Sequence, residues 1–369
     1  MTRGFEAGTE PVPDSSTGRV DVDRLTGWLD ANGVGSGPIT GLVPLAGGTQ
    51  NLLLRFTRAG RDYVLRMPPE HKRANSDSTM VREATVLAGL AGSDVPHPRF
   101  VALCEDLDLF GCCFFVMEAV DGYSAMSELP QVFREDPALQ RRMGMSLVDV
   151  LAALGRVDPV AAGVAHLGNA DGWLERQVSR WQRQLDSYAE FERWPGPETL
   201  GDVAGLGRWL QARVPRSWRP GVIHGDFHLG NILFSRTAPE VAAILDWELA
   251  TIGDPLLDLG HLLATWPGPG GPGRTPPAAP MPGLPDRAAI IERYAAGSDR
   301  DLGAEFVLID WYQALACYRL AILLEGSHAR ASAGRAPAEI GAQLHRAAVT
   351  LVEQGLGLAR GATGLPHSE

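Results

Sequence analysis

The apolar positions of this chain change their period along the sequence. Between residues 39 and 68, three short apolar runs alternate with Gly-containing turns, a pattern typical of antiparallel strands. A helical repeat follows at 77–92, after an earlier short helical segment at 20–33. Two more apolar runs, joined by a polar turn, predict strands at 99–105 and 112–120. The pattern therefore predicts a small lobe of five antiparallel strands and one packed helix.

Beyond this region the apolar repeat is mostly helical. Helices are predicted at 138–157 and 172–190, and again from 255 to the end of the pattern near 361. Three short strands interrupt the helices, at 221–224, 231–234 and 241–246. The Pro- and Gly-rich stretch at 266–285 is long for a connection, which indicates either a disordered loop or a functional lid.

These changes predict a fold and its division. We expect a flexible tail at 1–18, an N-terminal nucleotide-binding lobe at 19–118, a hinge at 119–123 and a C-terminal catalytic and substrate-binding lobe at 124–369. A strand-rich lobe followed by a larger, mainly helical lobe is the plan shared by kinases. The predicted fold class is therefore α+β, bilobal and protein-kinase-like.

Composition narrows the classes of function. Hydrophobic residues make up 45% of the chain, which is typical of globular proteins, and the net charge of −11 argues against nucleic-acid binding. No apolar stretch reaches membrane length, so no membrane partner is predicted. The first residues lack a signal-peptide pattern and the four cysteines lack metal-ligand spacing, so we expect a cytoplasmic protein with reduced thiols. Nothing in the pattern predicts an oligomeric state.

Four polar residues crowd into the stretch "GVIHGDFHLGNILF" at 221–234. Asp226 and Asn231 are five residues apart, the spacing between the base and a metal ligand in the kinase catalytic loop. Asp246 ends the next apolar run. Phosphoryl transfer needs oxygen ligands for Mg²⁺ and a carboxylate beside the attacking hydroxyl. We therefore predict Asp226 as the base, with Asn231 and Asp246 as metal ligands; the alternative is a polar turn with structural caps.

A second candidate pair lies in the first lobe. Arg66 ends the third predicted strand, and Glu83 lies on the inward face of the following helix. In kinases, a cation on this strand bridges the helix Glu and the nucleotide phosphates. We predict the same pair here, although Arg replaces the usual Lys. The alternative is an exposed Arg and a solvated Glu.

Backbone groups supply the remaining nucleotide contacts that we predict. The turn "LAGGTQN" at 45–51 can bring N–H groups close to phosphate oxygens, with an ordinary hairpin as the alternative. Its candidate residues are Gly47, Gly48, Thr49 and Asn51. The backbone of Glu118 and Val120 is predicted to bind adenine at the hinge. We interpret Asp254 as a helix cap, Asp258 as a support for the polar loop, and His261 as a core histidine.

The motifs "HGDFHLGNILF" and "ILDWELATIGDPLLDLGHLL" resemble those of the aminoglycoside-phosphotransferase superfamily of small-molecule kinases. The resemblance covers roughly 20–355 and implies Asp226 as base, Asn231 and Asp246 on Mg²⁺, and His228 close to the transferring phosphate. The segments "YVLRMPP", "LERQVSRWQRQ" and "GLPDRAAIIERYAA" resemble a subgroup, the kinase domains associated with acyl-CoA dehydrogenases. Arg66 is a trait of this subgroup, whereas His228 stands where the subgroup commonly carries Arg.

The resemblance implies an ATP-dependent phosphotransferase that uses Mg²⁺ and acts on a hydroxyl group of a small molecule. The best-understood relatives phosphorylate hydroxyacyl-CoA, which makes a metabolite of this type the expected acceptor. The alternative is an aminoglycoside or macrolide antibiotic phosphotransferase. A nucleotide-binding pseudokinase is disfavoured because every group that the chemistry requires is present. The acceptor is expected in the C-terminal lobe, between 173–190, 266–285 and 305–325.

Overall fold

The computed structural model divides the chain into two compact units. The first unit comprises residues 1–91 and 98–120, and the second comprises 92–97 and 121–369. The residues that the structure describes are 19–45, 51–72, 74–268, 277–300 and 308–362.

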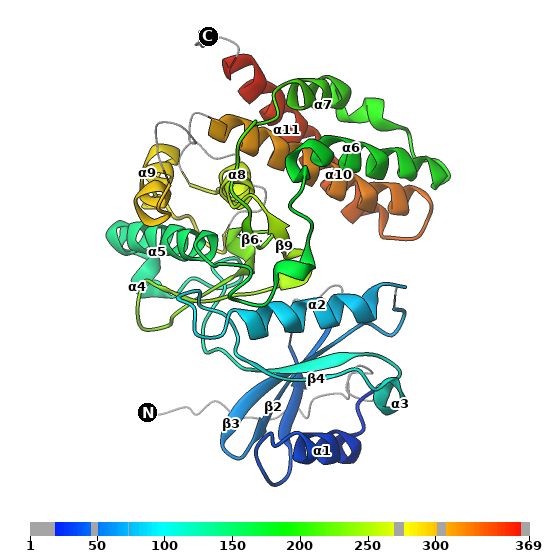
Figure 1. The fold of residues 1–369 in the computed structure, drawn as a ribbon, viewed down its shortest axis with the longest axis vertical. Coiled ribbons are helices and arrows are strands. Elements are labelled where there is room, and N and C mark those ends of the chain that lie inside the picture. The colour runs from blue at the N-terminus through cyan, green and yellow to red at the C-terminus, as the bar shows by residue number, and fades with distance from the viewer. Residues whose placement is uncertain (1–18, 46–50, 73, 269–276, 301–307, 363–369) are drawn as a thin grey trace, which may run out of the picture. The chain divides into compact units, whose positions relative to one another are not determined.

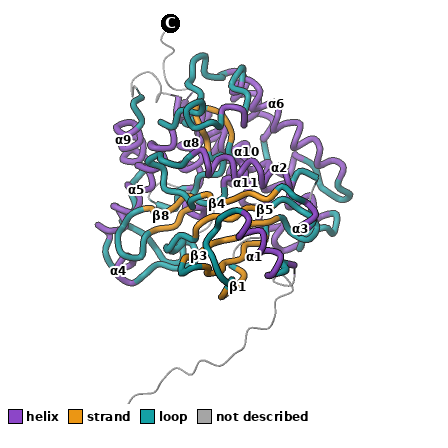
Figure 2. Tube along the Cα trace, turned by 60° about the horizontal axis from the view of Figure 1, so that its bottom comes forward, coloured by secondary structure: helices purple, strands orange, loops and turns teal. Residues whose placement is uncertain are grey.

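The first unit is built on a five-stranded sheet with the order β1-β2-β3-β5-β4 (Figure 1). Its strands are β1 (Thr40–Pro44), β2 (Leu52–Arg58), β3 (Arg61–Met67), β4 (Phe100–Cys104) and β5 (Phe114–Glu118). Every neighbouring pair is antiparallel, and Figure 2 shows β4 and β5 side by side. The five strands predicted from the apolar runs are all present, each within a few residues of its predicted position.

Two helices cover opposite faces of this sheet: α1 (Val22–Ala31) on one and α2 (Ser76–Gly89) on the other (Figure 1). Leu25 and Leu29 of α1 join a buried cluster that includes Leu65 and Met67 of β3. Because side chains alternate along a strand, Arg66 points to the other face of the sheet. The alternation of β3 therefore directs Arg66 toward the face that α2 covers.

The connection between β4 and β5 differs from the prediction. A polar turn was expected there, but residues Leu107–Phe110 form the single helical turn α3. The side chain of Asp106 caps it by accepting a hydrogen bond from the N–H of Asp108, and Gly111 ends it in the left-handed conformation. A segment of four residues is too short to show a helical repeat, so the pattern could not predict it.

The second unit is mainly helical. Its helices are α4 (Gln131–Arg134), α5 (Pro137–Gly155), α6 (Trp173–Asp186), α7 (Val203–Ala212), α8 (Leu256–Thr265), α9 (Arg287–Gly297), α10 (Ile309–Ser332) and α11 (Ala338–Ala362). Helix α10 packs against α6, α7, α8 and α11, so it forms the core around which these helices gather (Figure 1). Most of its residues are buried, which explains why its sequence is apolar on nearly every face.

Two small antiparallel ladders interrupt these helices. The hairpin of β7 (Ile232–Phe234) and β8 (Val241–Ile244) is one, and the pair of β6 (Gly221–Ile223) and β9 (Thr251–Gly253) is the other. Strand β9 was not predicted, because three residues carry too little alternation to be recognised. Strand β8 also ends two residues before the predicted 246, because Asp246 adopts a left-handed backbone conformation with φ of 64°.

The Pro- and Gly-rich segment at 266–285 is attached to the second unit at its described ends. Trp266 donates a hydrogen bond from Nε1 to the carbonyl of Pro285 over 2.8 Å, and the N–H of Gly283 donates to Gln140. Residues 269–276 lie outside the described ranges. All four cysteines are buried thiols. Within the described ranges, every helix falls short of the length and apolar character needed to cross a membrane.

Candidate active site

The loop between β6 and β7 holds the polar residues of the central motif. Gly225 adopts a φ of 83° there, and a Cβ atom at this position would lie 2.5 Å from the carbonyl oxygen of Leu249. Only glycine combines the left-handed conformation with this close approach. The sharp turn at Gly225 redirects the chain immediately before Asp226, so the position of Asp226 depends on it.

Asp258, at the start of α8, holds the backbone of the loop through hydrogen bonds. Its carboxylate accepts hydrogen bonds from two successive backbone N–H groups, those of His224 at 2.6 Å and Gly225 at 2.9 Å. Burial raises the pKa of Asp258, although the two N–H groups oppose this rise. The support of the loop predicted for Asp258 is therefore present.

His224 ties the loop to the neighbouring hairpin. Its Nδ1 atom accepts the N–H of Asp226 at 3.2 Å, so its Nε2 atom carries the proton and donates to the carbonyl of Leu245 at 2.8 Å. The ring also packs against Trp247, with 4.8 Å between the ring centroids. His224 is fully buried, and its contacts join both ends of the motif.

The carboxylate of Asp226 lies among three side chains. Nε2 of His261 is 3.2 Å from Oδ1, Nε2 of His228 is 3.4 Å from Oδ2, and Nδ2 of Asn231 is 3.3 Å from Oδ2. Burial by itself raises the pKa of Asp226, but the contacts with His228 and His261 outweigh burial and hold the pKa well below its usual range. Asp226 is therefore ionised across the physiological pH range.

His261 has a more specific environment than the sequence indicated. It is fully buried, as expected of a core histidine, but it contacts Asp226 directly. Burial lowers its pKa to about 4, so the ring is neutral at neutral pH. One signal in the sequence pointed to this contact: Asp258 and His261 are three residues apart on α8 and share a face of the helix.

The register of the β7–β8 hairpin brings the backbones of the two predicted metal ligands close together. Ile232 pairs with Ile244, and the N–H of Leu245 donates to the carbonyl of Asn231 at 2.8 Å, which places Asp246 next to Asn231 at the end of the ladder. The Nδ2 group of Asn231 donates to the carbonyl of Asp226 at 3.0 Å. Because Nδ2 is engaged there, Oδ1 of Asn231 is the atom that can bind a cation.

In the first unit, the predicted pair of Arg66 and Glu83 forms. Nε of Arg66 lies 2.8 Å from Oε2 of Glu83, and both side chains are at least nine-tenths buried. Such a pair is fixed in place, since a buried charge left without a partner is costly. Asn51 lies just before β2, whereas Gly47, Gly48 and Thr49 lie outside the described residues.

The end of β5 carries the two residues predicted to bind adenine. The N–H of Glu118 donates to the carbonyl of Arg99 at 2.9 Å, so the role predicted for the Glu118 backbone falls to its carbonyl group. The Glu118 side chain forms ion pairs with Arg99 and, at 3.8 Å, with Arg61. Val120 follows the strand and is half-buried. Adenine binding by either residue stays a prediction.

A buried arginine also belongs to the surroundings of Asp226. Arg319 of α10 is only 5% exposed, and its guanidinium lies over the ring of Trp181 of α6, 5.3 Å from the centroid. Burial lowers the pKa of Arg319, and the charges of Asp226 and Asp258 oppose this shift. Among the described residues, none accepts a hydrogen bond from its Nη1 atom. The sequence had indicated only that Arg319 interrupts an apolar run.

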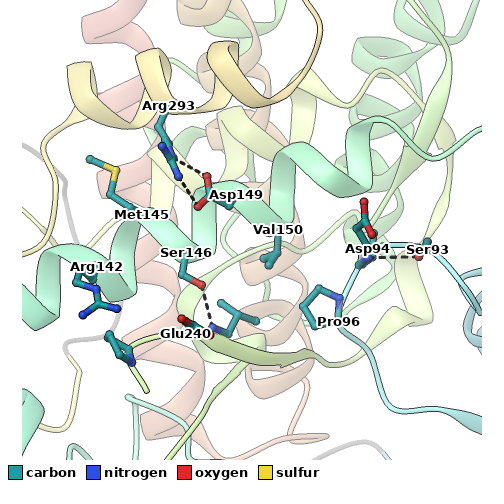
Figure 3. Close-up of a pocket in the computed structure, with 13 residues that line it drawn as sticks. Ser93, Asp94, Pro96, Arg142, Met145, Ser146, Asp149, Val150, Glu240 and Arg293 are labelled. Atoms are coloured by element: carbon teal, nitrogen blue, oxygen red, sulfur yellow. Dashed lines mark hydrogen bonds and ion pairs between the residues drawn. The ribbon is translucent and has the colours of Figure 1, made fainter. Parts of the chain in front are cut away.

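A cavity of about 600 Å³ opens in the second unit beside α5 (Figure 3). Arg293 of α9 and Asp149 of α5 form a two-pronged ion pair at its wall, with distances of 2.5 and 2.8 Å. The N–H of Val241 donates to the hydroxyl of Ser146 at 2.9 Å. None of the predicted site residues lines this cavity, so we do not assign it to the candidate active site.

Comparisons with known proteins agree on one family. The model of the phosphotransferase enzyme family matches residues 41–278. Acyl-CoA dehydrogenase family member 11 of Homo sapiens is 28% identical over 330 residues, which are 85% of this chain and 39% of that protein. The chain spans less than half the length of the acyl-CoA dehydrogenase relatives that it matches.

Two solved structures share the fold. A candidate aminoglycoside phosphotransferase from Ralstonia eutropha JMP134 is 28% identical, with a TM-score of 0.77 over 92% of this chain and 98% of that chain. Aminoglycoside phosphotransferase APH(4)-Ia, in a ternary complex with AMP-PNP and hygromycin B, has a TM-score of 0.58 at 14% identity. The latter covers 90% of this chain and 99% of that chain. These neighbours confirm the predicted α+β, kinase-like fold.

Proposed function

Because the chain belongs to the phosphotransferase enzyme family, we propose that it is a kinase that transfers the γ-phosphate of ATP to a hydroxyl group of a small molecule. The observation that carries this proposal is the setting of Asp226, an ionised carboxylate held between two histidines and beside Asn231. A polar turn with ordinary caps does not require a buried histidine against its carboxylate. The complex of APH(4)-Ia with an ATP analogue supports ATP as the phosphate donor.

We assign Mg²⁺ to Asn231 and Asp246. The donor set fits this ion, since a carboxylate and an amide oxygen are hard ligands of the kind Mg²⁺ prefers. The closeness of the two backbones at the end of the hairpin supports the assignment. When bound, the ion would neutralise charge on the phosphate oxygens. Asp246 holds its left-handed conformation at a cost that is typical of functional positions.

Asp226 is assigned to the acceptor hydroxyl. In the proposed step the hydroxyl oxygen forms a bond to the γ-phosphorus, the bond from that phosphorus to the bridging oxygen of ADP breaks, and the hydroxyl proton passes to the Asp226 carboxylate. His228 and His261 lie next to the carboxylate, one beside each of its oxygens. The low pKa of Asp226 means that it first orients the hydroxyl and accepts its proton only as the new bond forms.

We assign nucleotide binding to the first unit and the acceptor to the second. The buried pair with Glu83 fixes Arg66, whose guanidinium can bind phosphate oxygens in the two-pronged way that lysine cannot. The backbone near Asn51 and the carbonyl of Glu118 are the further nucleotide contacts in this assignment. Their assignment rests on the resemblance to kinases, whereas that of Arg66 also rests on its contact with Glu83 in the structure.

The acceptor that we favour is an anionic hydroxy metabolite of the hydroxyacyl-CoA type. Its support is the likeness to acyl-CoA dehydrogenase family members. Aminoglycoside or macrolide antibiotics remain the alternative because both structural neighbours are described as aminoglycoside phosphotransferases.

The test is a turnover screen with Mg-ATP against hydroxyacyl-CoAs, aminoglycosides and macrolides, with ADP release as the first measurement. We expect release with a hydroxyacyl-CoA, a phosphorylated product by mass spectrometry, and neither with Asp226→Asn. Turnover with an antibiotic alone would overturn the acceptor class but keep the phosphotransferase. ATP binding without turnover of any acceptor would favour the pseudokinase.

A further inference from the structure

We infer that the helical hairpin of α10 and α11 carries a binding site for a divalent transition-metal ion, formed by Glu325, His328 and His345. One possible ligand atom from each of the three residues lies within 4.8 Å of the other two. The inference does not depend on the proposed phosphotransfer, because none of the three residues belongs to the candidate active site.

The two helices bring the three residues together near the turn of the hairpin. Glu325 and His328 are three residues apart on α10, so they lie on one face of that helix, one turn from each other. His345 comes from the facing side of α11. A Cβ atom on Gly341 of α11 would lie only 2.4 Å from the Cβ of Ala331 of α10, which shows how closely the helices approach here.

The three side chains already lie in contact with one another, and a hydrogen bond joins His345 to Glu325 where a metal ion would join them. Nδ1 of His345 lies 2.7 Å from Oε2 of Glu325, and the rings of His328 and His345 have centroids 4.5 Å apart. A tetrahedral Zn²⁺ ion holds its ligand atoms about 3.3 Å apart, given metal–ligand distances of about 2.0–2.1 Å. Each distance between ligand atoms would therefore change by at most about 1.5 Å when the ion binds.

Two observations separate this cluster from an ordinary ion pair. Nδ1 of His328 is buried, and no residue in the described part of the chain forms a hydrogen bond with it. Glu325 is fully buried, and Nε1 of Trp194 donates to its Oε1 atom at 2.7 Å. A carboxylate oriented by a second hydrogen bond from outside the ligand set is a common feature of metal sites.

The ligand types select the ion. Two imidazoles and one carboxylate suit Zn²⁺ and its transition-metal neighbours, whereas Mg²⁺ prefers oxygen ligands in octahedral geometry. Three protein ligands leave one position for water, and the His345 side chain is 21% exposed, so solvent can reach the site. A bound ion would join α11 to α10, the helix on which the second unit is packed.

The test is calorimetric titration of the full chain, without nucleotide and without an added histidine tag, using ZnCl₂ and separately MgCl₂. We expect one Zn²⁺ per chain, no binding of Mg²⁺ at this site, and loss of the Zn²⁺ site in His345→Gln and in His328→Gln. His166→Gln removes an exposed histidine elsewhere in the second unit and should leave Zn²⁺ binding unchanged. Trp194→Phe should weaken Zn²⁺ affinity by about 10–100-fold, since it removes only the supporting hydrogen bond.

The histidines around Asp226 could also bind Zn²⁺. Hydrogen exchange of backbone amides is therefore needed to show which site the ion occupies. Binding should slow the exchange of amides near Glu325 in α10 and near His345 in α11, in wild type and equally in Asp246→Ala. The inference is overturned if Zn²⁺ does not bind saturably at micromolar concentration, or binds equally to both histidine variants. Protection confined to the loop around Asp226 would also overturn it. Circular dichroism shows whether each variant is folded.

Discussion

Nε2 of His261 lies 3.2 Å from Oδ1 of Asp226, although His261 is fully buried and Asp226 carries the charge on which the proposed chemistry depends. A neutral imidazole is thus packed against an ionised carboxylate, since burial lowers the pKa of His261 to about 4 while that of Asp226 stays well below its usual range. The pair has consequences for stability as well as for catalysis.

As the pH falls, the fold should first lose stability because of His261. The pKa of an unfolded histidine is about 6.5, so between that value and about 4 the unfolded chain binds a proton that the folded chain excludes. The free energy of unfolding should therefore fall with decreasing pH in this window, with up to about 1.4 kcal/mol per pH unit from this group. Asp226 adds its own loss only below about pH 4, where its unfolded form becomes protonated.

Urea unfolding of wild type and His261→Gln at several pH values between 6.5 and 4.5 measures this effect. The variant should show a shallower dependence on pH, because the titrating group is gone, while the exposed His166→Gln control keeps the wild-type slope. Equal slopes in wild type and His261→Gln would show that the histidine is protonated in the folded protein.

Asp226→Asn should abolish most turnover and leave Mg-ATP binding nearly intact. The change removes the negative charge but keeps the size of the side chain, and general-base assistance contributes about 10²–10⁴-fold. Turnover, nucleotide affinity and melting temperature should be measured on one preparation. Asp286→Asn is the matched control, since Asp286 caps α9 by accepting the N–H of Ala289 and Asn caps equally well. Comparable turnover in both variants would reject the role of Asp226.

Asp246→Asn should weaken the affinity for Mg-ATP by about tenfold or more, which corresponds to about 1.4 kcal/mol. Asn tolerates the left-handed conformation that residue 246 adopts, so the fold should survive, whereas Asp246→Ala combines the loss of the ligand with backbone strain. Calorimetry with ATP, in the presence and absence of Mg²⁺, separates the two effects. If Mg²⁺ improves ATP binding equally in wild type and Asp246→Asn, the metal assignment is wrong.

Arg66→Ala should lose activity and stability together, because it leaves the buried carboxylate of Glu83 without its partner, at a cost of about 3–5 kcal/mol. Arg66→Lys should keep part of the activity, since it retains the positive charge but loses the two-pronged binding of phosphate by the guanidinium. Arg55→Ala, which removes a half-exposed arginine of β2 in the same sheet, is the control and should change neither property much.

The double variant Arg66→Met with Glu83→Leu separates the two roles of the pair. Apolar side chains can replace a buried ion pair with little loss of stability, so this protein should melt close to the wild-type temperature. Its turnover and ATP affinity should nevertheless stay low, because the cation for the phosphates is absent. Wild-type turnover in this stable double variant would reduce Arg66 to a structural residue.

The sequence predicted those parts of the fold that carry a repeated pattern. The strands of the first unit were recognisable because apolar residues alternate over several positions, and α5 and α6 because their apolar residues repeat with the helical period. Strand β9 and helix α3 have three and four residues, which is less than one readable period.

The candidate site was predictable where its residues follow a spacing or an element order shared by kinases, as the loop residues and the Arg66–Glu83 pair do. The spacing of Asp226 and Asn231 along the loop was readable, but the contact of Asp226 with His261 depends on how α8 packs beneath the loop. Arg319 was missed for the same reason, since only the packing of α10 against α6 places its guanidinium on Trp181. When two charged side chains meet only because their helices pack together, the spacing of residues along the sequence does not reveal the contact.

Because a hairpin joins Asn231 to Asp246, the number of residues between them can vary without separating the two residues. Both residues lie at the open end of the ladder, whereas the chain reverses at the opposite end, where Arg236 and Thr237 are exposed. Residues added at that reversal would lengthen the loop without changing the register that pairs Ile232 with Ile244. A fluorescent-protein tag or a recognition peptide could accordingly be inserted after Thr237 without moving Asn231 away from Asp246.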